Sequence, residues 1–152
     1  MSAPELISNS SLDALIIVSD VRVAKPLKKD DDRQELYWIH AKAKWDTGAM
    51  VCAISRSLCR QLGITPNVTA YTRSISGTDS GFAEMILLDL MLAGTFISTP
   101  AIVVNEMPGA DCDMLIGMNV ICQGDFNIST DAEKKQITVS FKPYPETLKK
   151  YK

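Results

Sequence analysis

The stretch AKWDTGA, residues 43–49, places a carboxylate directly after an apolar strand end. Asp46 carries the carboxylate, Thr47 offers a hydroxyl that can bond across the loop, and Gly48 permits the close approach of another backbone. Taken alone, these three residues also fit an ordinary turn after a strand. The rest of the sequence therefore has to decide whether the loop is functional.

The sequence around this loop predicts a mostly β domain with one or two short helices. Strands are expected at residues 14–23, 35–45, 71–92 (as a hairpin with its turn at 76–81), 96–104, 114–116 and 136–141. Pro100 predicts that its strand lies at a sheet edge or bends. A helix that is capped by Ser55 and ends at Gly63 is expected at residues 52–62, and a second helix at residues 119–124.

The chain has 152 residues, which suits one domain. We expect a flexible N-terminus over residues 1–13, a single domain over residues 14–145 and a polar tail over residues 146–152. The formal net charge is −2, so the composition provides no basic field for nucleic acid. No apolar run is long enough to span a bilayer, and the N-terminus lacks a secretory signal. These features predict a cytoplasmic protein with no nucleic-acid or membrane partner.

The sequence offers little for a metal site. Its four cysteines form no Cys-x-x-Cys pair, and its one histidine is His40. All four cysteines lie in or beside apolar stretches, so we expect them to be buried free thiols in a reducing compartment. His40 falls on the polar face of its predicted strand, which leaves serine and cysteine nucleophiles without an evident base. We therefore expect neither a metal nor another cofactor.

A second motif lies about 70 residues after Asp46, in LIGMNVI at residues 115–121. There, two bulky aliphatic residues, a glycine, one further residue and an asparagine open a short helix. Between the two motifs lies a hairpin tip that contains glycine and serine, SISGTDSG at residues 74–81. In this order and spacing, residues 36–142 resemble the retropepsin-like aspartic proteases, in particular the single-domain bacterial members.

The resemblance implies a single-lobe acid-protease fold, which is a closed β-barrel, and aspartic endopeptidase activity. This chemistry uses two carboxylates that share a proton, one acting as the base and the other as the acid. The chain has one Asp-Thr-Gly, so the second carboxylate has to come from another copy across a two-fold axis. The implied partners are therefore a second copy of the chain and a peptide or protein substrate, with no cofactor.

The same resemblance assigns residues to the site. Asp46, Thr47 and Gly48 form the catalytic loop, and Thr47 bonds the equivalent loop of the second subunit. The hairpin tip acts as a flap that closes over an extended substrate. The residues implied in substrate binding are Ala49 beside the catalytic loop and, at the flap tip, Ser76, Gly77 and Thr78.

Two positions depart from the retroviral pattern. Retroviral enzymes carry an aspartate and an arginine where this chain has Met50 and Met118. Because both charges are absent together, neither is left buried without a partner, and two methionines can replace the ion pair by apolar packing. The substrate contacts and the subunit interface are therefore expected to differ from the retroviral ones.

Two other functions stay open on the sequence. The chain could be a catalytically silent module that dimerises and binds an extended peptide, or a structural β domain in which Asp-Thr-Gly is incidental. The joint presence of both motifs argues against the structural domain, and the intact Asp46 favours an enzyme over the silent module. We interpret Asp111 and Asp113, which flank Cys112, and Asp125 as structural residues.

Overall fold

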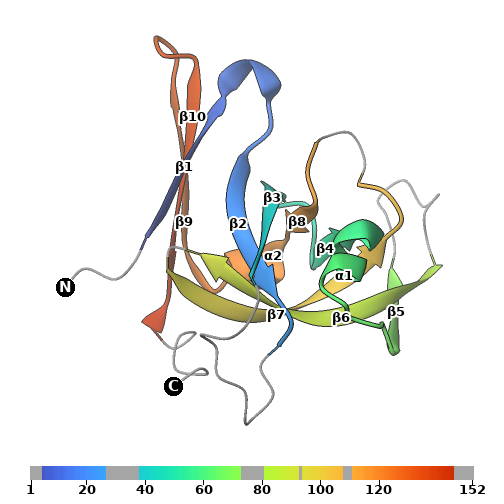
Figure 1. The fold of residues 1–152 in the computed structure, drawn as a ribbon. Helices are drawn as coiled ribbons and strands as arrows, with labels where there is room; N and C mark the ends of the chain where they lie inside the picture. Colours follow the sequence, from blue (N-terminus) through green and yellow to red (C-terminus); the bar gives the residue numbers. More distant parts are fainter. Residues whose placement is uncertain (1–4, 27–37, 73–80, 93, 108–110, 146–152) are drawn as a thin grey trace.

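The computed structural model describes residues 5–26, 38–72, 81–92, 94–107 and 111–145. Within these ranges the chain forms a closed β-barrel with a three-stranded sheet beside it (Figure 1). The barrel strands follow the order β2 (Val18–Ala24), β3 (Ile39–Trp45), β8 (Met114–Ile116), β4 (Cys52–Ser55), β7 (Thr95–Val104) and β6 (Gly81–Leu92). The barrel closes where β2 pairs with β6, with Val23 opposite Leu90. The prediction of a mostly β, closed-barrel fold is confirmed.

Side chains on alternate positions of the barrel strands point into one core. In β3, Ala41, Ala43 and Trp45 are buried, whereas Lys42 between them is exposed. The Trp45 ring lies 5.0 Å from the ring of Phe126 and 5.4 Å from that of Phe141. These contacts pack the residue that precedes Asp46 against the neighbouring sheet.

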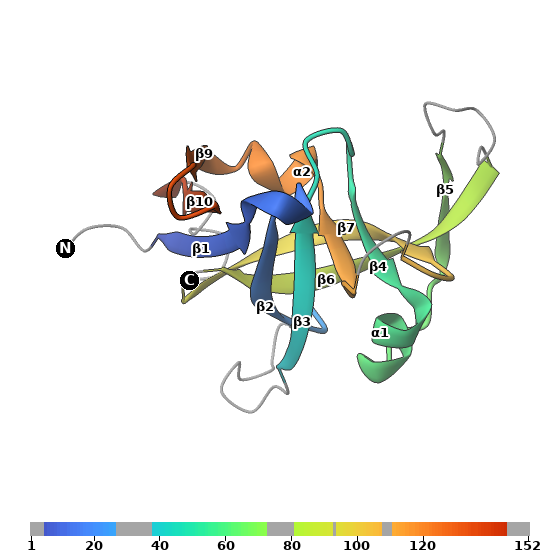
Figure 2. The same cartoon turned by 90° about the horizontal axis from the view of Figure 1, so that it is seen from above.

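The neighbouring sheet contains β1 (Leu6–Ser11), β10 (Gln136–Pro143) and β9 (Gly124–Asp131), and it lies to one side of the barrel (Figure 2). We expected residues 1–13 to form a flexible N-terminus, but residues 6–11 within that segment pair with β10 along their length. The Ser8 hydroxyl also donates to the Val18 carbonyl at 3.0 Å. The polar composition was misleading because only every second side chain of this strand is half-buried, and β10 supplies its backbone partners.

The helices are shorter than the sequence predicted. The expected helix at residues 52–62 is divided, because residues 52–55 form β4 between β7 and β8 and the helix α1 covers Arg56–Gln61. Ser55 caps α1 as expected, since its hydroxyl accepts a bond from the Leu58 nitrogen at 3.1 Å. The second helix, α2, covers Met118–Ile121, and a 3₁₀ turn covers Leu12–Ala14.

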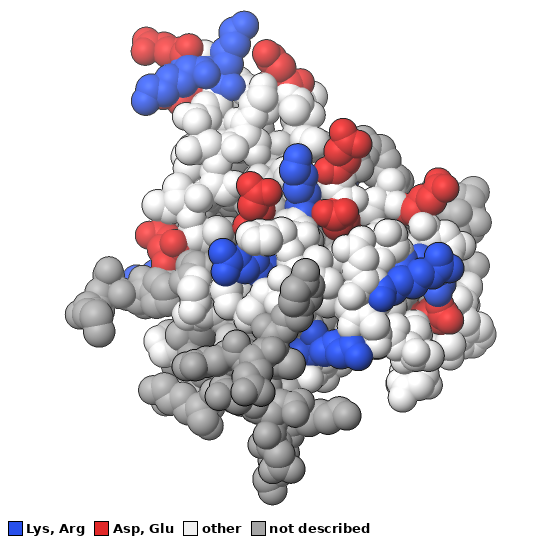
Figure 3. All heavy atoms as spheres, in the orientation of Figure 1, with Lys and Arg blue, Asp and Glu red and all other residues white. Residues whose placement is uncertain are grey.

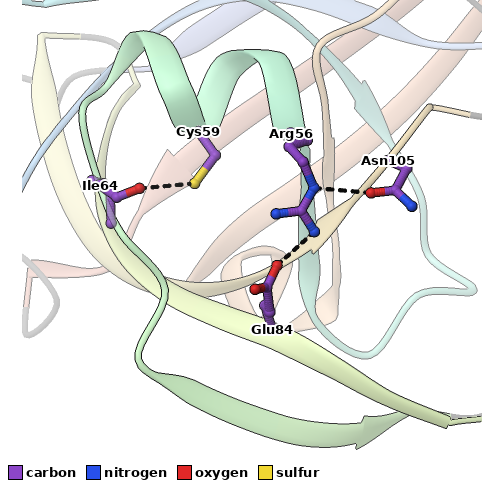
Figure 4. A network of polar contacts seen from close by, with 5 residues as sticks. All are labelled: Arg56, Cys59, Ile64, Glu84 and Asn105. Atoms are coloured by element: carbon purple, nitrogen blue, oxygen red, sulfur yellow. Dashed lines mark hydrogen bonds and ion pairs between the residues drawn. The ribbon is translucent and has the colours of Figure 1, made fainter.

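The long predicted hairpin appears as β6 and β5 (Val68–Thr72), which pair from Val68 opposite Met85 to Thr72 opposite Gly81. These arms extend beyond the barrel at the end away from the three-stranded sheet (Figure 2). Most of the predicted turn lies outside the described residues. The base of this hairpin is connected to α1, because the Arg56 guanidinium lies 2.5 Å from the Glu84 carboxylate and donates to Asn105 at 2.9 Å (Figure 4).

Two further expectations need correction. The strand with Pro100 was expected to lie at a sheet edge or to bend, and the first of these is excluded, since β7 runs between β4 and β6. The missing N–H of Pro100 is tolerated because the pairing with β4 begins only at the next residue, Ala101. All four cysteines are free, but only Cys52 and Cys59 are buried; Cys112 is half-buried and Cys122, directly after α2, is exposed.

The surface carries charges of both signs. On the face shown in Figure 3, acidic and basic side chains are interspersed among neutral ones. No helix within the described part of the chain is long and apolar enough to cross a membrane.

Candidate functional site

Two segments that are far apart in the sequence place Asp46. β3 ends at Trp45, and β8 runs parallel to it with Ile116 opposite Trp45. The next backbone nitrogen, that of Asp46, donates to the Ile116 carbonyl at 3.0 Å. The Asp-Thr-Gly loop and the LIGMN motif therefore begin side by side at the same end of two adjacent strands.

A tight turn orients the Asp46 side chain. The Ala49 nitrogen donates to the Asp46 carbonyl at 3.2 Å, and the Gly48 nitrogen donates to Asp46 Oδ1 at 2.9 Å. Asp46 is half-buried, and Thr47 and Gly48 are exposed. The carboxylate is thus held by its own loop while the turn remains open to a partner or substrate.

The second motif supports this turn from behind. The Met118 nitrogen donates to the Ala49 carbonyl at 2.7 Å, and the Asn119 nitrogen donates to the Met50 carbonyl at 3.1 Å. Gly117 makes this approach feasible, because a Cβ there would lie 2.6 Å from backbone atoms of Val51. The glycine is required by the close contact with another backbone.

The Asn119 amide connects three parts of the barrel. Its oxygen accepts a bond from the Cys52 nitrogen at 3.0 Å, and its nitrogen donates to the Thr99 hydroxyl at 2.8 Å and to the Pro100 carbonyl at 3.1 Å. Burial raises the pKa of the adjacent Cys52 thiol, against smaller opposing effects of its hydrogen bonds with Gly117, Thr99 and Asn119. The sequence motif marks Asn119 but not Cys52 or Thr99, because no local pattern marks partners so distant in sequence.

A pocket of about 220 Å³ opens directly beside Asp46. Its walls are formed by Leu15, Ile16, Ile17, Lys44, Trp45 and Asp46. The Trp45 nitrogen donates to the Ile17 carbonyl at 3.0 Å, which fixes the apolar wall against the end of β3. Lys44 was not predicted as a site residue, although its position two residues before Asp46 places both side chains on one face of an extended backbone.

The structure brings together four of the predicted site residues, Asp46, Thr47, Gly48 and Ala49, in one turn against residues 117–119. The predicted flap residues, Ser76, Gly77 and Thr78, lie outside the described residues. Only the two arms that lead to them, β5 and β6, are described.

The other candidate residues lie on the surface or accept hydrogen bonds from nearby residues. His40 is exposed on the outer face of β3, as predicted. The Asp113 carboxylate accepts a bond from the Lys42 nitrogen at 2.8 Å, and Asp125 accepts one from the Tyr144 hydroxyl at 3.1 Å. Over the described ranges, no group of three or more His, Cys, Asp or Glu side chains is arranged to hold a metal ion.

No protein-family model matches the sequence, and no curated protein matches it. Solved structures do align with the fold. A retropepsin-like aspartic protease from Rickettsia conorii aligns with a TM-score of 0.59 at 18% identity, over 93% of this chain and 94% of the other. This alignment shows that the chain has the retropepsin-like fold.

Two other solved structures align with lower scores. The simian foamy virus (mac) protease has a TM-score of 0.43 at 15% identity, over 67% of this chain and 88% of the other. The retroviral protease-like domain of Ddi1 from Leishmania major has a TM-score of 0.39 at 13% identity, over 96% and 97% of the two chains.

Proposed function

We propose that this chain is an aspartic endopeptidase whose catalytic pair consists of Asp46 from each of two identical subunits. The observation that carries the proposal is the Asp46 turn. Its carboxylate is oriented by the Gly48 nitrogen, and the turn is supported by the Met118 nitrogen at the Ala49 carbonyl. A carboxylate held this firmly at an open turn suits chemistry that needs a fixed base and acid.

The chemistry follows from placing two such turns face to face. Two carboxylates a few Å apart cannot both ionise, so they hold one proton between them. The ionised member removes a proton from water, which attacks the peptide carbonyl, and the protonated member donates to the carbonyl oxygen. Because each chain has one Asp-Thr-Gly, a two-fold axis between the turns supplies the second carboxylate.

The surface around the turn is consistent with a second copy. Met50, which follows the turn, is 84% exposed. Its side chain is therefore available to pack against a second copy of the turn. In the proposed dimer, Thr47 bonds the opposite loop and Met50 packs where retroviral enzymes use a charged pair.

The proposed substrate is an extended peptide that lies between the turn and the hairpin. Ala49 forms the floor beside the catalytic pair. The flap tip, with Ser76, Gly77 and Thr78, closes over the peptide from the other side. The Arg56 contacts at the base of β6 would fix the direction from which the hairpin approaches (Figure 4).

The test compares the purified wild-type chain with Asp46→Asn on a mixture of unlabelled peptides, with products identified by mass spectrometry. Asparagine retains an oxygen for the Gly48 nitrogen, so the turn persists while the acid–base pair is lost. The cleavage rate should fall by a factor of about 10² or more. Asp20→Asn is the control, since it removes an exposed carboxylate from β2.

Two results decide against the proposal. Unchanged cleavage by Asp46→Asn would assign the chemistry to another residue or protein. A wild-type chain that dimerises and binds extended peptides without cleaving them would identify the silent peptide-binding module instead. Sedimentation measurements on the same samples should show a dimer that dissociates on dilution. The cleavage rate per chain should fall over the same range of concentration.

A further inference from the structure

The pocket beside Asp46 has an unusual combination of walls. Leu15, Ile16 and Ile17 form an apolar side, and Lys44 provides the only cation among its lining residues. Its volume of about 220 Å³ suits one amino-acid side chain rather than a length of peptide. Because Asp46 itself forms part of the wall, any side chain in this pocket belongs to a residue close to the bond that Asp46 acts on.

Lys44 is available to such a side chain. It is half-buried, and within the described part of the chain no carboxylate forms an ion pair with it. The nearby Asp113 is directed to Lys42, because its carboxylate accepts a hydrogen bond from the Lys42 backbone nitrogen at 2.8 Å. Among the described residues the ammonium of Lys44 therefore has no carboxylate partner, and Lys44 lies on the same face of the chain as Asp46.

The apolar wall begins at a residue with a left-handed backbone. Leu15 has a φ of 54°, in the left-handed region that a bulky residue seldom occupies. The residue is 82% exposed, so burial of its own side chain does not explain the conformation. The conformation ends the 3₁₀ turn at Leu12–Ala14, where the Leu15 nitrogen donates to the Leu12 carbonyl at 3.3 Å, and it leads the chain into the pocket wall beside Asp46.

We propose that this pocket binds a glutamate side chain next to the scissile bond and that Lys44 determines the preference. The inference rests on the proposed peptidase function and names its substrate class. The two methylene groups of glutamate would pack against the isoleucines, and the carboxylate would reach the Lys44 ammonium. In a two-fold dimer each subunit contributes one such pocket, so the preference applies on both sides of the cleaved bond.

The experiment uses three sets of extended peptides of otherwise random sequence, with glutamate, glutamine or leucine fixed at the two central positions. Glutamine has nearly the shape of glutamate without its charge. The wild-type chain should cleave the glutamate set at the central bond about tenfold faster than the glutamine set, because a charge-assisted bond to Lys44 is lost with the carboxylate.

Two variants separate the role of Lys44 from the general charge of the strand. Lys44→Met keeps a long side chain but removes the ammonium, and it should abolish the glutamate preference. Lys42→Met removes an equal charge on the same strand and face, about 7 Å further from Asp46 at the rise of a strand, and it should keep the preference. Equal rates on glutamate and glutamine by the wild type, or a preference unchanged in Lys44→Met, overturn the proposal.

Binding to the Asp46→Asn chain, measured by fluorescence anisotropy with the same peptides, gives a readout that does not need cleavage. A glutamate preference in binding without cleavage by the wild type contradicts the peptidase and supports the pocket. Cleavage without a glutamate preference supports the peptidase and contradicts the pocket. If the wild type does not cleave and the Asp46→Asn chain shows no glutamate preference in binding, both proposals are contradicted.

Discussion

The side-chain oxygen of Asn119 accepts a hydrogen bond from the backbone nitrogen of Cys52 at 3.0 Å, across 67 residues of sequence. This bond fastens the start of α2 to the start of β4, and the turn that carries Asp46 lies in the chain just before Cys52. This amide adds to the backbone bonds between the two motifs, and its nitrogen also bonds Thr99 and Pro100.

Asn119→Ala should lower the free energy of unfolding by about 2–3 kcal/mol, because it leaves the Cys52 nitrogen and the Pro100 carbonyl without their partner. Urea denaturation measures the change. Asn127→Ala, at an exposed position of β9, is the control and should change the value by less than about 0.5 kcal/mol. An equally small effect of Asn119→Ala would show that the amide does not support the fold.

Gly117→Ala should destabilise the chain by about 1–3 kcal/mol and also displace the Asp46 turn, since the new methyl group would lie 2.6 Å from Val51 and 2.9 Å from the Ala49 carbonyl. These contacts are backbone atoms, which cannot move aside independently. Gly81→Ala is matched to it, because no atom lies within 4 Å of a Cβ there. The unfolding temperature should fall in Gly117→Ala and stay unchanged in Gly81→Ala, and peptide cleavage by Gly117→Ala should decline as well. Equal unfolding temperatures of the two variants would contradict the close contact.

Arg56→Met should lower the free energy of unfolding by about 0.5–1 kcal/mol and speed amide exchange in β6, because it removes the bonds to Glu84 and Asn105. The effect is small since the two charged side chains are 33% and 41% exposed. High salt should reduce it further. Arg60→Met, on the exposed side of α1, provides the comparison, and unchanged exchange in β6 of Arg56→Met would show that the contact does not hold the hairpin.

Cys122 should react first with iodoacetamide at pH 8, and Cys52 last. Cys122 is exposed, whereas burial both shields the Cys52 thiol and raises its pKa, so less of the reactive thiolate is present. Peptide mapping by mass spectrometry gives the order, and denatured protein should label at all four cysteines alike. Early modification of Cys52 in the folded chain would contradict its burial.

The raised pKa of Cys52 also predicts the direction of a pH effect on stability. Below the ordinary thiol pKa of about 8.5, the Cys52 thiol is protonated in both the folded and the unfolded chain. Its contribution to the free energy of unfolding is then fully present. As the pH rises further, the unfolded thiol loses its proton while the folded one keeps it, so the free energy of unfolding should fall. Cys52→Ala should show a shallower decline between pH 8 and 10; an equal slope would assign the decline to other groups.

Much of the fold could be predicted because strand alternation is a local property. The alternation of Ala41, Ala43 and Trp45 with lysines predicts which face of β3 is buried, and the structure agrees. Ser55 was recognised as a cap from its type and position. Boundaries were less certain where pairing partners decide the conformation: Cys52–Ser55 became a strand because two neighbours were available, and the polar residues 6–11 became one because β10 was adjacent.

The sequence by itself determined the two motifs, their order and the fact that one chain holds a single Asp-Thr-Gly, which is why the proposed peptidase is a dimer. Only the tertiary structure decided that Ile116 lies beside Trp45, that Asn119 bonds Cys52, and that Leu15 and Lys44 share a pocket with Asp46. The physical reason is that side-chain periodicity depends on a few neighbouring residues. Pairing between strands depends on surfaces that meet only when the whole barrel has closed.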